Sequence, residues 1–201
     1  MSKEILSMVK NMNVKAVEIQ LILQCAPFIS GLKKSNLLLV NKEKLYKLKK
    51  LLDGSLISYS ILYENSNKIA LLLYNEPEMN KYLNNESIKA FLMDMGYKDI
   101  SFKNILKIFK LRYEKYMQDN EEFPHEMGIL LGYPIEDVKG FVKNKGKNSL
   151  YTGYWKVYDK VEEKEKLFEK FKQVEETMIK LIYYGITMEE ILDIYSEDRK
   201  C

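Results

Sequence analysis

Two short apolar segments separated by a polar turn limit the folds that this chain can adopt. Residues 56–63 and 68–74 have the aliphatic and aromatic composition of strands, and residues 64–67 between them read Glu-Asn-Ser-Asn. Asn and Ser favour tight turns because their side chains hydrogen-bond to the nearby backbone. Two strand-like runs joined by such a turn predict a β-hairpin, and therefore an antiparallel pair of strands.

Segments with helical periodicity surround this hairpin. We expect helices over residues 2–24, 42–52, 102–118 and 161–184, one or two over 76–95, and short ones opening at Pro124 and Pro134. Pro27 should end the first helix, and Thr187 should cap a last one through Glu190. We expect further strands over residues 36–40 and 151–158. The sequence thus predicts an α+β fold, with a small antiparallel sheet of about four strands covered by several helices.

Composition indicates one globular domain. The chain has 201 residues, of which 46% are hydrophobic, with only 9 glycines and 4 prolines. Such a mixture can build a core and excludes collagen-like and disordered classes. Because no Ser/Pro-rich linker is visible, we expect a single domain over residues 1–201, with the long amphipathic helix at 161–184 near its C-terminal end.

Cysteine content and apolar run lengths bear on location. No apolar run approaches the roughly 20 residues that cross a bilayer, so no membrane span is expected. Glu4 stands where a signal peptide would turn apolar, which disfavours secretion. Two cysteines, Cys25 and Cys201, are too few for a disulfide scaffold. These features together favour a reducing, cytoplasmic location.

The basic residues give no strong signal for nucleic acid. The net charge is +3, and only Arg112 and Arg199 are arginines among the 32 basic side chains. Specific phosphate and guanine contacts favour the arginine fork over the lysine ammonium. The lysine-rich runs are therefore more typical of solvated helix faces.

The segment 123–141, Phe-Pro-His-Glu-Met-Gly-Ile-Leu-Leu-Gly-Tyr-Pro-Ile-Glu-Asp-Val-Lys-Gly-Phe, contains the single histidine of the chain. If a proline opens each helix, His125 and Glu126 fall in one first turn, and Glu136 and Asp137 in the other. Free backbone N–H groups there favour anions and a neutral imidazole. Two interpretations stay open: an acid/base and anion-binding site, or helix-start acids beside a hydrogen-bonded structural histidine.

Zinc chemistry finds little support in this segment. A metalloprotease helix needs a second histidine four residues after the first, and that position is Ile129. The chain holds three Cys and His residues in all, fewer than the four ligands of a structural zinc site. We therefore predict no metal site, with a mixed site of Cys25, His125 and a carboxylate as the alternative.

Cys25 lies in the segment Gln-Cys-Ala-Pro-Phe-Ile-Ser-Gly-Leu-Lys, which ends at Lys33. Its thiol could act as a nucleophile or ligand if Lys33 or His125 stabilised the thiolate. The alternative is a small buried apolar side chain on the core face of the first helix. A position near a helix C-terminus favours this alternative, because the negative dipole end raises the pKa of a thiol.

The single tryptophan lies in an aromatic segment, residues 153–158. Strand alternation places Tyr154, Lys156 and Tyr158 on one face, and Trp155 and Val157 on the other. Aromatic strands can stack on bases or flat cofactors, and they also pack sheets against helices.

Taken together, these segments resemble an uncharacterised bacterial family found mainly in anaerobic Firmicutes, domain of unknown function 3793. The family's Cys-(Ala/Ser)-Pro…Gly-x-Lys motif is matched by Cys25, Pro27, Gly31 and Lys33. Its long Phe-Pro-His-Glu motif is matched over residues 123–141, and its Gly-x-Trp-Lys-Val-Tyr motif over 153–158. Many relatives have further cysteines before the tryptophan and near Val174, and this chain lacks them. A ligand role for those cysteines is therefore not carried over.

The resemblance implies that the motif residues form one site, and we consider three functions for it. As an enzyme, the chain would use Cys25 as nucleophile and His125 as general base, with Glu126 orienting the imidazole. As a non-catalytic regulatory module, it would bind an anionic metabolite, a metal or a planar cofactor. As a helical interaction module, it would dock through residues 161–184. A small anionic ligand would contact Lys33, Tyr133, Glu136, Asp137, Tyr154 and Trp155. Neither the cofactor nor the oligomeric state is indicated.

Overall fold

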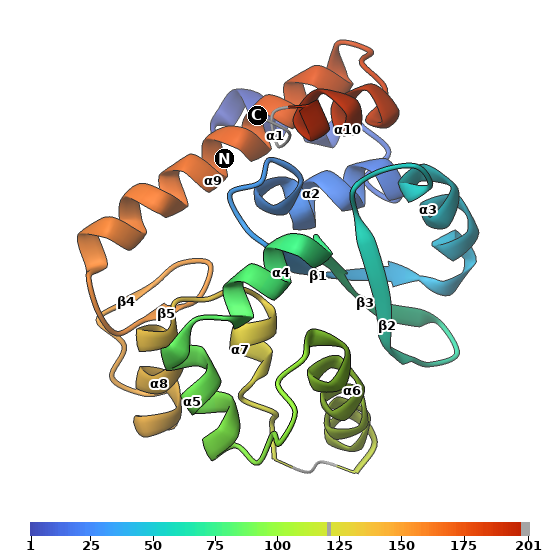
Figure 1. Ribbon diagram of the computed structural model, residues 1–201. Coiled ribbons are helices and arrows are strands. Elements are labelled where there is room, and N and C mark those ends of the chain that lie inside the picture. Colours follow the sequence, from blue (N-terminus) through green and yellow to red (C-terminus); the bar gives the residue numbers. More distant parts are fainter. Residues whose placement is uncertain (120–121, 198–201) are drawn as a thin grey trace. The chain divides into compact units, whose positions relative to one another are not determined.

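The computed structural model describes residues 1–119 and 122–197 (Figure 1). Contacts divide the chain into two compact units, which are described separately below. Unit 1 comprises Met1–Tyr74 and Glu169–Cys201, and unit 2 comprises Asn75–Phe168. The single domain expected from the sequence stays a prediction, and Arg199 and Cys201 lie outside the described residues.

Unit 1 is built on a three-stranded antiparallel sheet with the strand order β1-β3-β2. Its strands are β1 (Ser35–Asn41), β2 (Ser58–Glu64) and β3 (Lys68–Tyr74). Leu71 in the central strand lies opposite Leu38 of β1 and Ile61 of β2. The pairing of β2 with β3 confirms the predicted hairpin, although a register shift between Ile61 and Tyr63 interrupts it.

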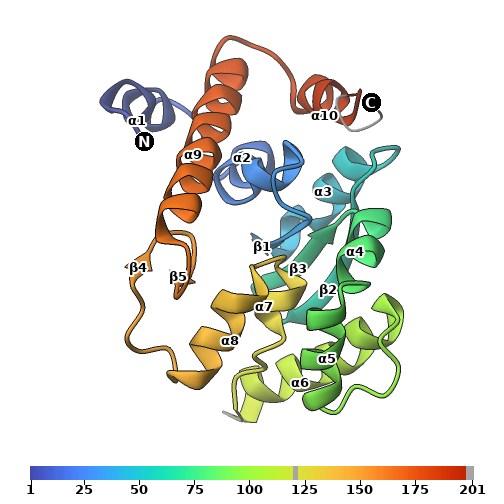
Figure 2. The ribbon, with the colours of Figure 1, turned by 60° about the vertical axis from the view of Figure 1, so that its left-hand side comes forward.

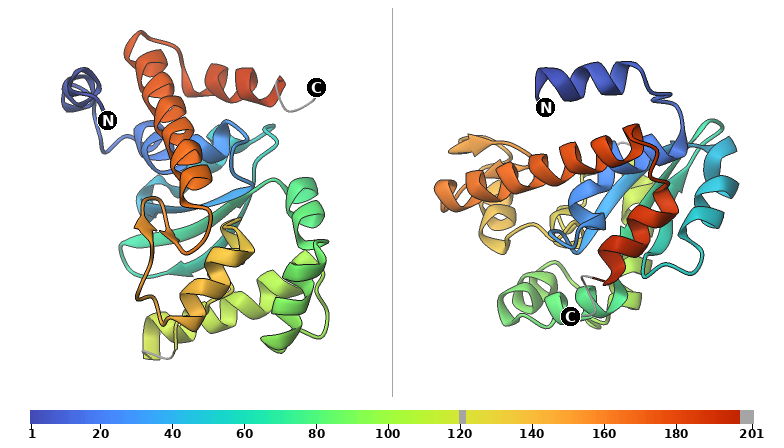
Figure 3. Two further views of the ribbon diagram at one scale, coloured as in Figure 1. Left: turned by 90° about the vertical axis from the view of Figure 1, so that its left-hand side faces the viewer. Right: turned by 90° about the horizontal axis from the view of Figure 1, so that it is seen from above.

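Helices cover one face of this sheet. They are α1 (Lys3–Lys10), α2 (Val17–Ile29), α3 (Leu45–Leu52) after the 3-10 turn η1 (Lys42–Lys44), and α10 (Met188–Glu197). The C-terminal part of α9 (Val161–Tyr183) completes the set. Helix α2 lies between the sheet and this part of α9 (Figure 2) and contacts α10 (Figure 3). Leu21, Phe28, Leu71 and Met178 are fully buried in the shared core.

The first predicted helix is wrong in two respects. Residues 2–24 form two helices, because Asn13 turns the chain: its side chain accepts a hydrogen bond from the Lys15 amide, and its carbonyl accepts one from Ala16. Pro27 does not end the second helix, which continues to Ile29. A proline in the last turn removes one hydrogen bond, and burial of Phe28 and Ile29 in the core compensates for that loss.

One side chain of α2 closes part of the sheet edge. The Gln24 amide donates to the Leu39 carbonyl at 3.1 Å, and its oxygen accepts from the Leu39 amide at 2.9 Å. Gln24 thus satisfies both backbone groups that this residue of β1 directs away from β3.

Unit 2 consists of helices and one short hairpin. The helices are α4 (Glu76–Leu83), α5 (Glu86–Asp94), α6 (Phe102–Asp119), α7 (Met127–Leu130) and α8 (Ile135–Lys143), followed by the first residues of α9. Asn85 separates α4 from α5, because its side chain accepts hydrogen bonds from the Ser87 and Ile88 amides and so starts a new helix. The prediction of one or two helices over 76–95 is therefore resolved as two.

The aromatic segment is a hairpin and not one strand. Strands β4 (Tyr151–Thr152) and β5 (Lys156–Val157) pair antiparallel around a turn at Gly153. A Cβ at this glycine would lie 2.4 Å from Phe168, so only glycine allows so close an approach. The predicted alternation nevertheless holds, since Trp155 and Val157 are buried and Tyr154 and Lys156 are exposed.

The α+β prediction is confirmed, with the antiparallel strands divided between a sheet of three and a sheet of two. Thr187 caps α10 as expected: its hydroxyl accepts from the Glu190 amide at 3.3 Å, and Glu190 Oε2 accepts from the Thr187 amide at 2.8 Å. Within residues 1–119 and 122–197, no helix is both long and apolar enough to cross a membrane.

Candidate functional site

A cavity of about 280 Å³ lies in unit 2, beside the single histidine. It is lined by aliphatic side chains and by polar groups of Asp137 and Lys156. Six rings also line it, those of Phe123, His125, Tyr133, Phe141, Tyr154 and Trp155. We call this space the His125 cavity. Its volume is near the lower end of the range for small-molecule pockets, about 300 to 1,000 Å³, so it suits a ligand of one ring or similar size.

His125 precedes the short helix α7 and does not lie in its first turn. The prediction of a dipole-stabilised site here is wrong, because α7 begins at Met127 and has only 4 residues. Phe123 and Phe141 flank the imidazole edge-to-face at 6.0 and 5.9 Å between ring centroids. Aromatic packing, and not a helix end, therefore positions the ring.

The two imidazole nitrogens have different surroundings. Nδ1 is buried and has no hydrogen-bond partner among the described residues, whereas Nε2 lies 3.8 Å from Oε1 of the exposed Glu122. With its proton on Nε2, the ring leaves a lone pair at the buried position, which costs less than an unmade N–H bond. The imidazole is thus arranged to donate from Nε2.

Glu126 does not orient the imidazole as we expected. Its fully buried carboxylate accepts hydrogen bonds at Oε1 from the Tyr97 hydroxyl at 2.8 Å and from Arg112 Nη1 at 2.9 Å. Arg112 also lies over the Tyr97 ring and donates to the Met95 carbonyl. Burial and the neighbouring Glu126 charge raise the pKa of Tyr97. Glu126 therefore joins α7 to α6 through Arg112.

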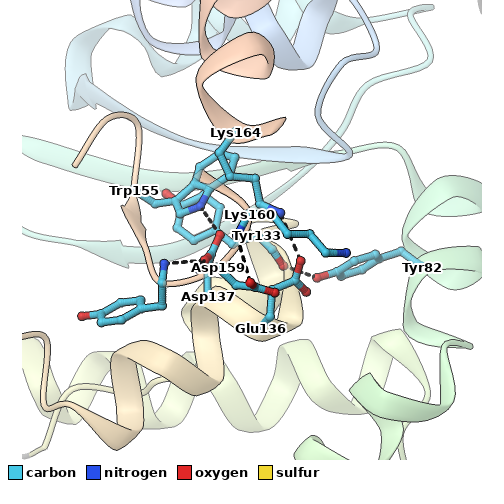
Figure 4. Close-up of polar contacts among 9 residues, drawn as sticks. Tyr82, Tyr133, Glu136, Asp137, Trp155, Asp159, Lys160 and Lys164 are labelled. Carbon is cyan, nitrogen blue, oxygen red and sulfur yellow. Dashed lines mark hydrogen bonds and ion pairs between the residues drawn. The ribbon is translucent and has the colours of Figure 1, made fainter. Parts of the chain in front are cut away.

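Asp137 fixes the indole of Trp155 at the cavity wall (Figure 4). Its Oδ2 accepts from Trp155 Nε1 at 2.8 Å, and its Oδ1 accepts from the amides of Tyr158 at 2.7 Å and Asp159 at 3.3 Å. Asp137 lies in the first turn of α8, as predicted. One buried carboxylate thereby connects α8 to the hairpin and to the chain that leads into α9.

Glu136, the neighbouring acid, has a cationic partner. Its Oε1 lies 3.1 Å from the ammonium of Lys164, a nearly buried lysine of α9 (Figure 4). Burial alone would raise the pKa of Glu136, but a bond from its own amide, then Lys164 and Lys160, lower it.

Tyr133 lines the His125 cavity next to Trp155. Its ring stacks on Trp155 with 4.8 Å between centroids, and its carbonyl accepts from the Tyr82 hydroxyl at 2.7 Å. Burial raises the pKa of both tyrosines. The stack is therefore held from α8 through Trp155 and from α4 through Tyr82.

The glycine at position 140 permits close packing around the site. A Cβ at Gly140 would come within 2.4 Å of Tyr158, so only glycine lets this residue approach α8. The glycine at this position of the motif thus reflects packing.

The other predicted residues of the site, Cys25 and Lys33, lie in unit 1. Cys25 is fully buried, and its Sγ accepts a weak hydrogen bond from Asn36 Nδ2 at 3.4 Å. Asn36 Oδ1 in turn accepts from Lys33 Nζ. Burial raises the pKa of the Cys25 thiol to about 12, although Asn36 and the Lys33 charge act in the opposite direction. Burial also lowers the pKa of Lys33, to about 8.

Unit 2 brings together five of the predicted residues at one cavity: His125, Tyr133, Asp137, Tyr154 and Trp155. Glu126 and Glu136 instead form ion pairs within the same unit. No group of three or more His, Cys, Asp or Glu side chains that could hold a metal is found in the described part of the chain.

Three residues with a role at the site escaped sequence reasoning. Phe123 and Phe141 are the first and last residues of the long motif, and their aromatic character was the available signal. Arg112, which neutralises Glu126, is one of only two arginines among 32 basic residues. An arginine in so lysine-rich a chain is a signal for an ion pair of demanding geometry.

Comparison with known proteins identifies a family but no activity. The family model described as "Protein of unknown function (DUF3793)" matches residues 21–192. No curated protein and no solved structure matches the chain.

Proposed function

The chain belongs to the DUF3793 family, whose description assigns no activity, and we propose that it is a small-molecule-binding protein whose site is the His125 cavity. The observation that carries this proposal is the combination of about 280 Å³ of space with six aromatic or imidazole rings around it. Apolar walls with a few convergent polar groups are typical of ligand sites.

The surroundings of Cys25 and His125 favour ligand binding over thiol catalysis. Cys25 is the nucleophile that the enzyme hypothesis requires, and a thiol with a pKa of about 12 is protonated near neutral pH. Glu126 does not orient the imidazole, because its carboxylate is bound to Arg112 and Tyr97. We therefore place ligand recognition, and not a Cys/His reaction, at the centre of the proposal.

The single tryptophan makes the proposal testable. Trp155 lines the cavity, so its fluorescence reports on occupancy without a label. We expect benzyl alcohol, a one-ring probe, to change the emission of Trp155 in a saturable way. Leu131→Phe would reduce the space and weaken this binding by about tenfold, since pockets discriminate single methylene-sized changes at that level.

The matched control is Leu111→Phe, the same substitution at an exposed position of α6. It should leave the titration unchanged. A titration without saturation, or one that both phenylalanine variants alter equally, would contradict a binding function for the cavity.

A cytoplasmic location is part of the same proposal. Its support is that the cysteine among the described residues, Cys25, is a buried free thiol and not half of a disulfide. Reducing compartments maintain that state. Recovery of the protein in a periplasmic or secreted fraction of its host would contradict it.

A further inference from the structure

We propose that the His125 cavity takes a small organic cation of the alkylammonium class, held by its aromatic rings and by the negative charge of Asp137. This inference rests on the proposed function, because it assigns a ligand class to the same cavity. It reverses the anionic ligand that the sequence suggested, since α7 supplies no extended helix end beside His125.

The walls of the cavity suit a cation. The face of an aromatic ring carries partial negative charge, which attracts ammonium groups within about 6 Å of the ring centre. Phe123, Tyr133, Phe141 and Tyr154 belong to the lining together with Trp155. Alkylammonium ions bind well in such surroundings because their methyl groups also bury apolar surface.

The charges of the three motif carboxylates differ in how they are balanced. Glu126 has Arg112 at 2.9 Å, and Glu136 has Lys164 at 3.1 Å. Asp137 is only 2% exposed, and its hydrogen bonds come from the Trp155 indole and two backbone amides, all neutral donors. No lysine or arginine within the described ranges forms an ion pair with it. Asp137 is thus a buried negative charge at the cavity wall whose partners among the described residues are all neutral.

Lys156 adds a positive charge to the cavity lining, but it is exposed to solvent whereas Asp137 is buried. Its side chain is exposed, and its ammonium donates to the Gly146 carbonyl at 2.6 Å. Water screens an exposed charge strongly, whereas a buried charge acts through a medium of lower dielectric constant. Inside the cavity, the field of Asp137 should therefore exceed that of Lys156.

A charge series of equal shape tests the proposal. Choline, its uncharged carbon isostere dimethylbutanol, and the anion dimethylbutyrate share one bulky branched end and differ in charge. We titrate each into the full chain and follow Trp155 fluorescence. Choline should bind at least about tenfold more tightly than dimethylbutanol, the size of effect expected for a desolvated cation over aromatic rings.

The other outcomes overturn the proposal in distinguishable ways. Equal binding of choline and dimethylbutanol would mean that the cavity recognises shape alone. Tightest binding of dimethylbutyrate would mean that Lys156 sets the preferred charge. In both cases the proposed binding function stands. If benzyl alcohol binds and choline does not, the proposed cation preference is wrong and the proposed binding function stands. If neither compound binds, the proposed binding function is wrong as well.

Two variants assign the preference to residues. Asp137→Asn should reduce the choline preference to less than about threefold, and retained dimethylbutanol binding in this variant shows an intact cavity. Tyr154→Leu changes an exposed wall residue, so it tests the rings even if Asp137→Asn fails to fold. It should weaken choline about threefold or more and leave dimethylbutanol unchanged. Equal loss for both probes would contradict a role of the ring in charge recognition.

Discussion

Cys25 in unit 1 and His125 in unit 2 both lie in motifs that define the family resemblance, yet their surroundings differ. The Cys25 thiol is fully enclosed by the core, whereas the His125 side chain keeps 22% of its surface exposed and borders a cavity. The side-chain amide of Asn36 donates to the Cys25 thiol and accepts from the ammonium of Lys33. The aromatic rings around His125, in contrast, enclose the His125 cavity. One motif residue is therefore enclosed by the core of its unit, and the other borders a cavity.

A reactive Cys25 thiol would contradict this difference between the two units most directly. In a Cys201→Ser background, we expect alkylation of Cys25 near pH 8.5 to be about a thousandfold slower than for a free thiol, because its thiolate is so scarce. The pKa of the folded thiol is about 12 against an ordinary value of 9.0, so the folded state should also lose stability from about pH 9 to pH 12.

The measurement is the pH dependence of iodoacetamide labelling, repeated with His125→Ala added. Unfolding the chain in urea should restore the ordinary rate, which serves as the control. An inflection of the labelling rate well below pH 8.5 that disappears in the His125→Ala variant would contradict this prediction. It would support Cys25 as a thiolate nucleophile, so that both motif residues would have a chemical role.

The second prediction concerns the carboxylate that holds the cavity wall. Asp137→Ala leaves the buried indole N–H of Trp155 and two partly buried backbone N–H groups without this acceptor. We expect a loss of about 3 kcal/mol in the free energy of unfolding, measured by urea denaturation with circular dichroism. Asp94→Ala, at an exposed acid, should change it by less than about 0.5 kcal/mol. Equal stability of both variants would mean that Asp137 does not hold the wall.

The third prediction separates packing from chemistry within the long motif. Gly140→Ala would place a Cβ 2.4 Å from Tyr158, which requires the hairpin to shift. A cost of about 2 kcal/mol is expected, measured in the same urea experiment. Lys139→Ala on the exposed side of α8 is the control and should have little effect. A stabilised glycine variant would show that helix propensity outweighs the close contact.

The smallest change in the free energy of unfolding is expected for the substitution of His125. His125→Leu should change the free energy of unfolding by less than about 1 kcal/mol, because the buried Nδ1 makes no hydrogen bond with a described residue. Thermal unfolding measures this. A loss above about 2 kcal/mol would support the structural histidine that the sequence left open.

Local rules predicted much of the fold but less of the site. The hairpin of β2 and β3, the capped start of α10 and the length of α9 follow from turn residues, a capping box and helical periodicity. The division at Asn13 and the turn at Gly153 were missed. The division at Asn13 comes from local hydrogen bonds that helical periodicity does not reveal. The turn at Gly153 depends on close packing against Phe168, a later residue of the chain.

For the site, residue types pointed to the correct segment but not to the partners. His125, Asp137 and Trp155 were selected because histidine, paired acids and a lone tryptophan are conspicuous in a sequence. That Asp137 would bind Trp155, and Glu126 would bind Arg112, depends on how α8 and α6 pack within unit 2. Spacing along one chain does not contain that information.

The Gln24 amide on the edge of β1 has a consequence for the behaviour of the protein at high concentration. An open strand edge is a template on which another chain can add a strand, and an exposed apolar side chain makes that addition more favourable. Leu39 is such a residue, with 48% of its surface exposed. Because Gln24 already occupies both backbone groups of Leu39, an incoming chain would have to displace it. This glutamine therefore protects against aggregation at the point of the strand where apolar surface would promote it.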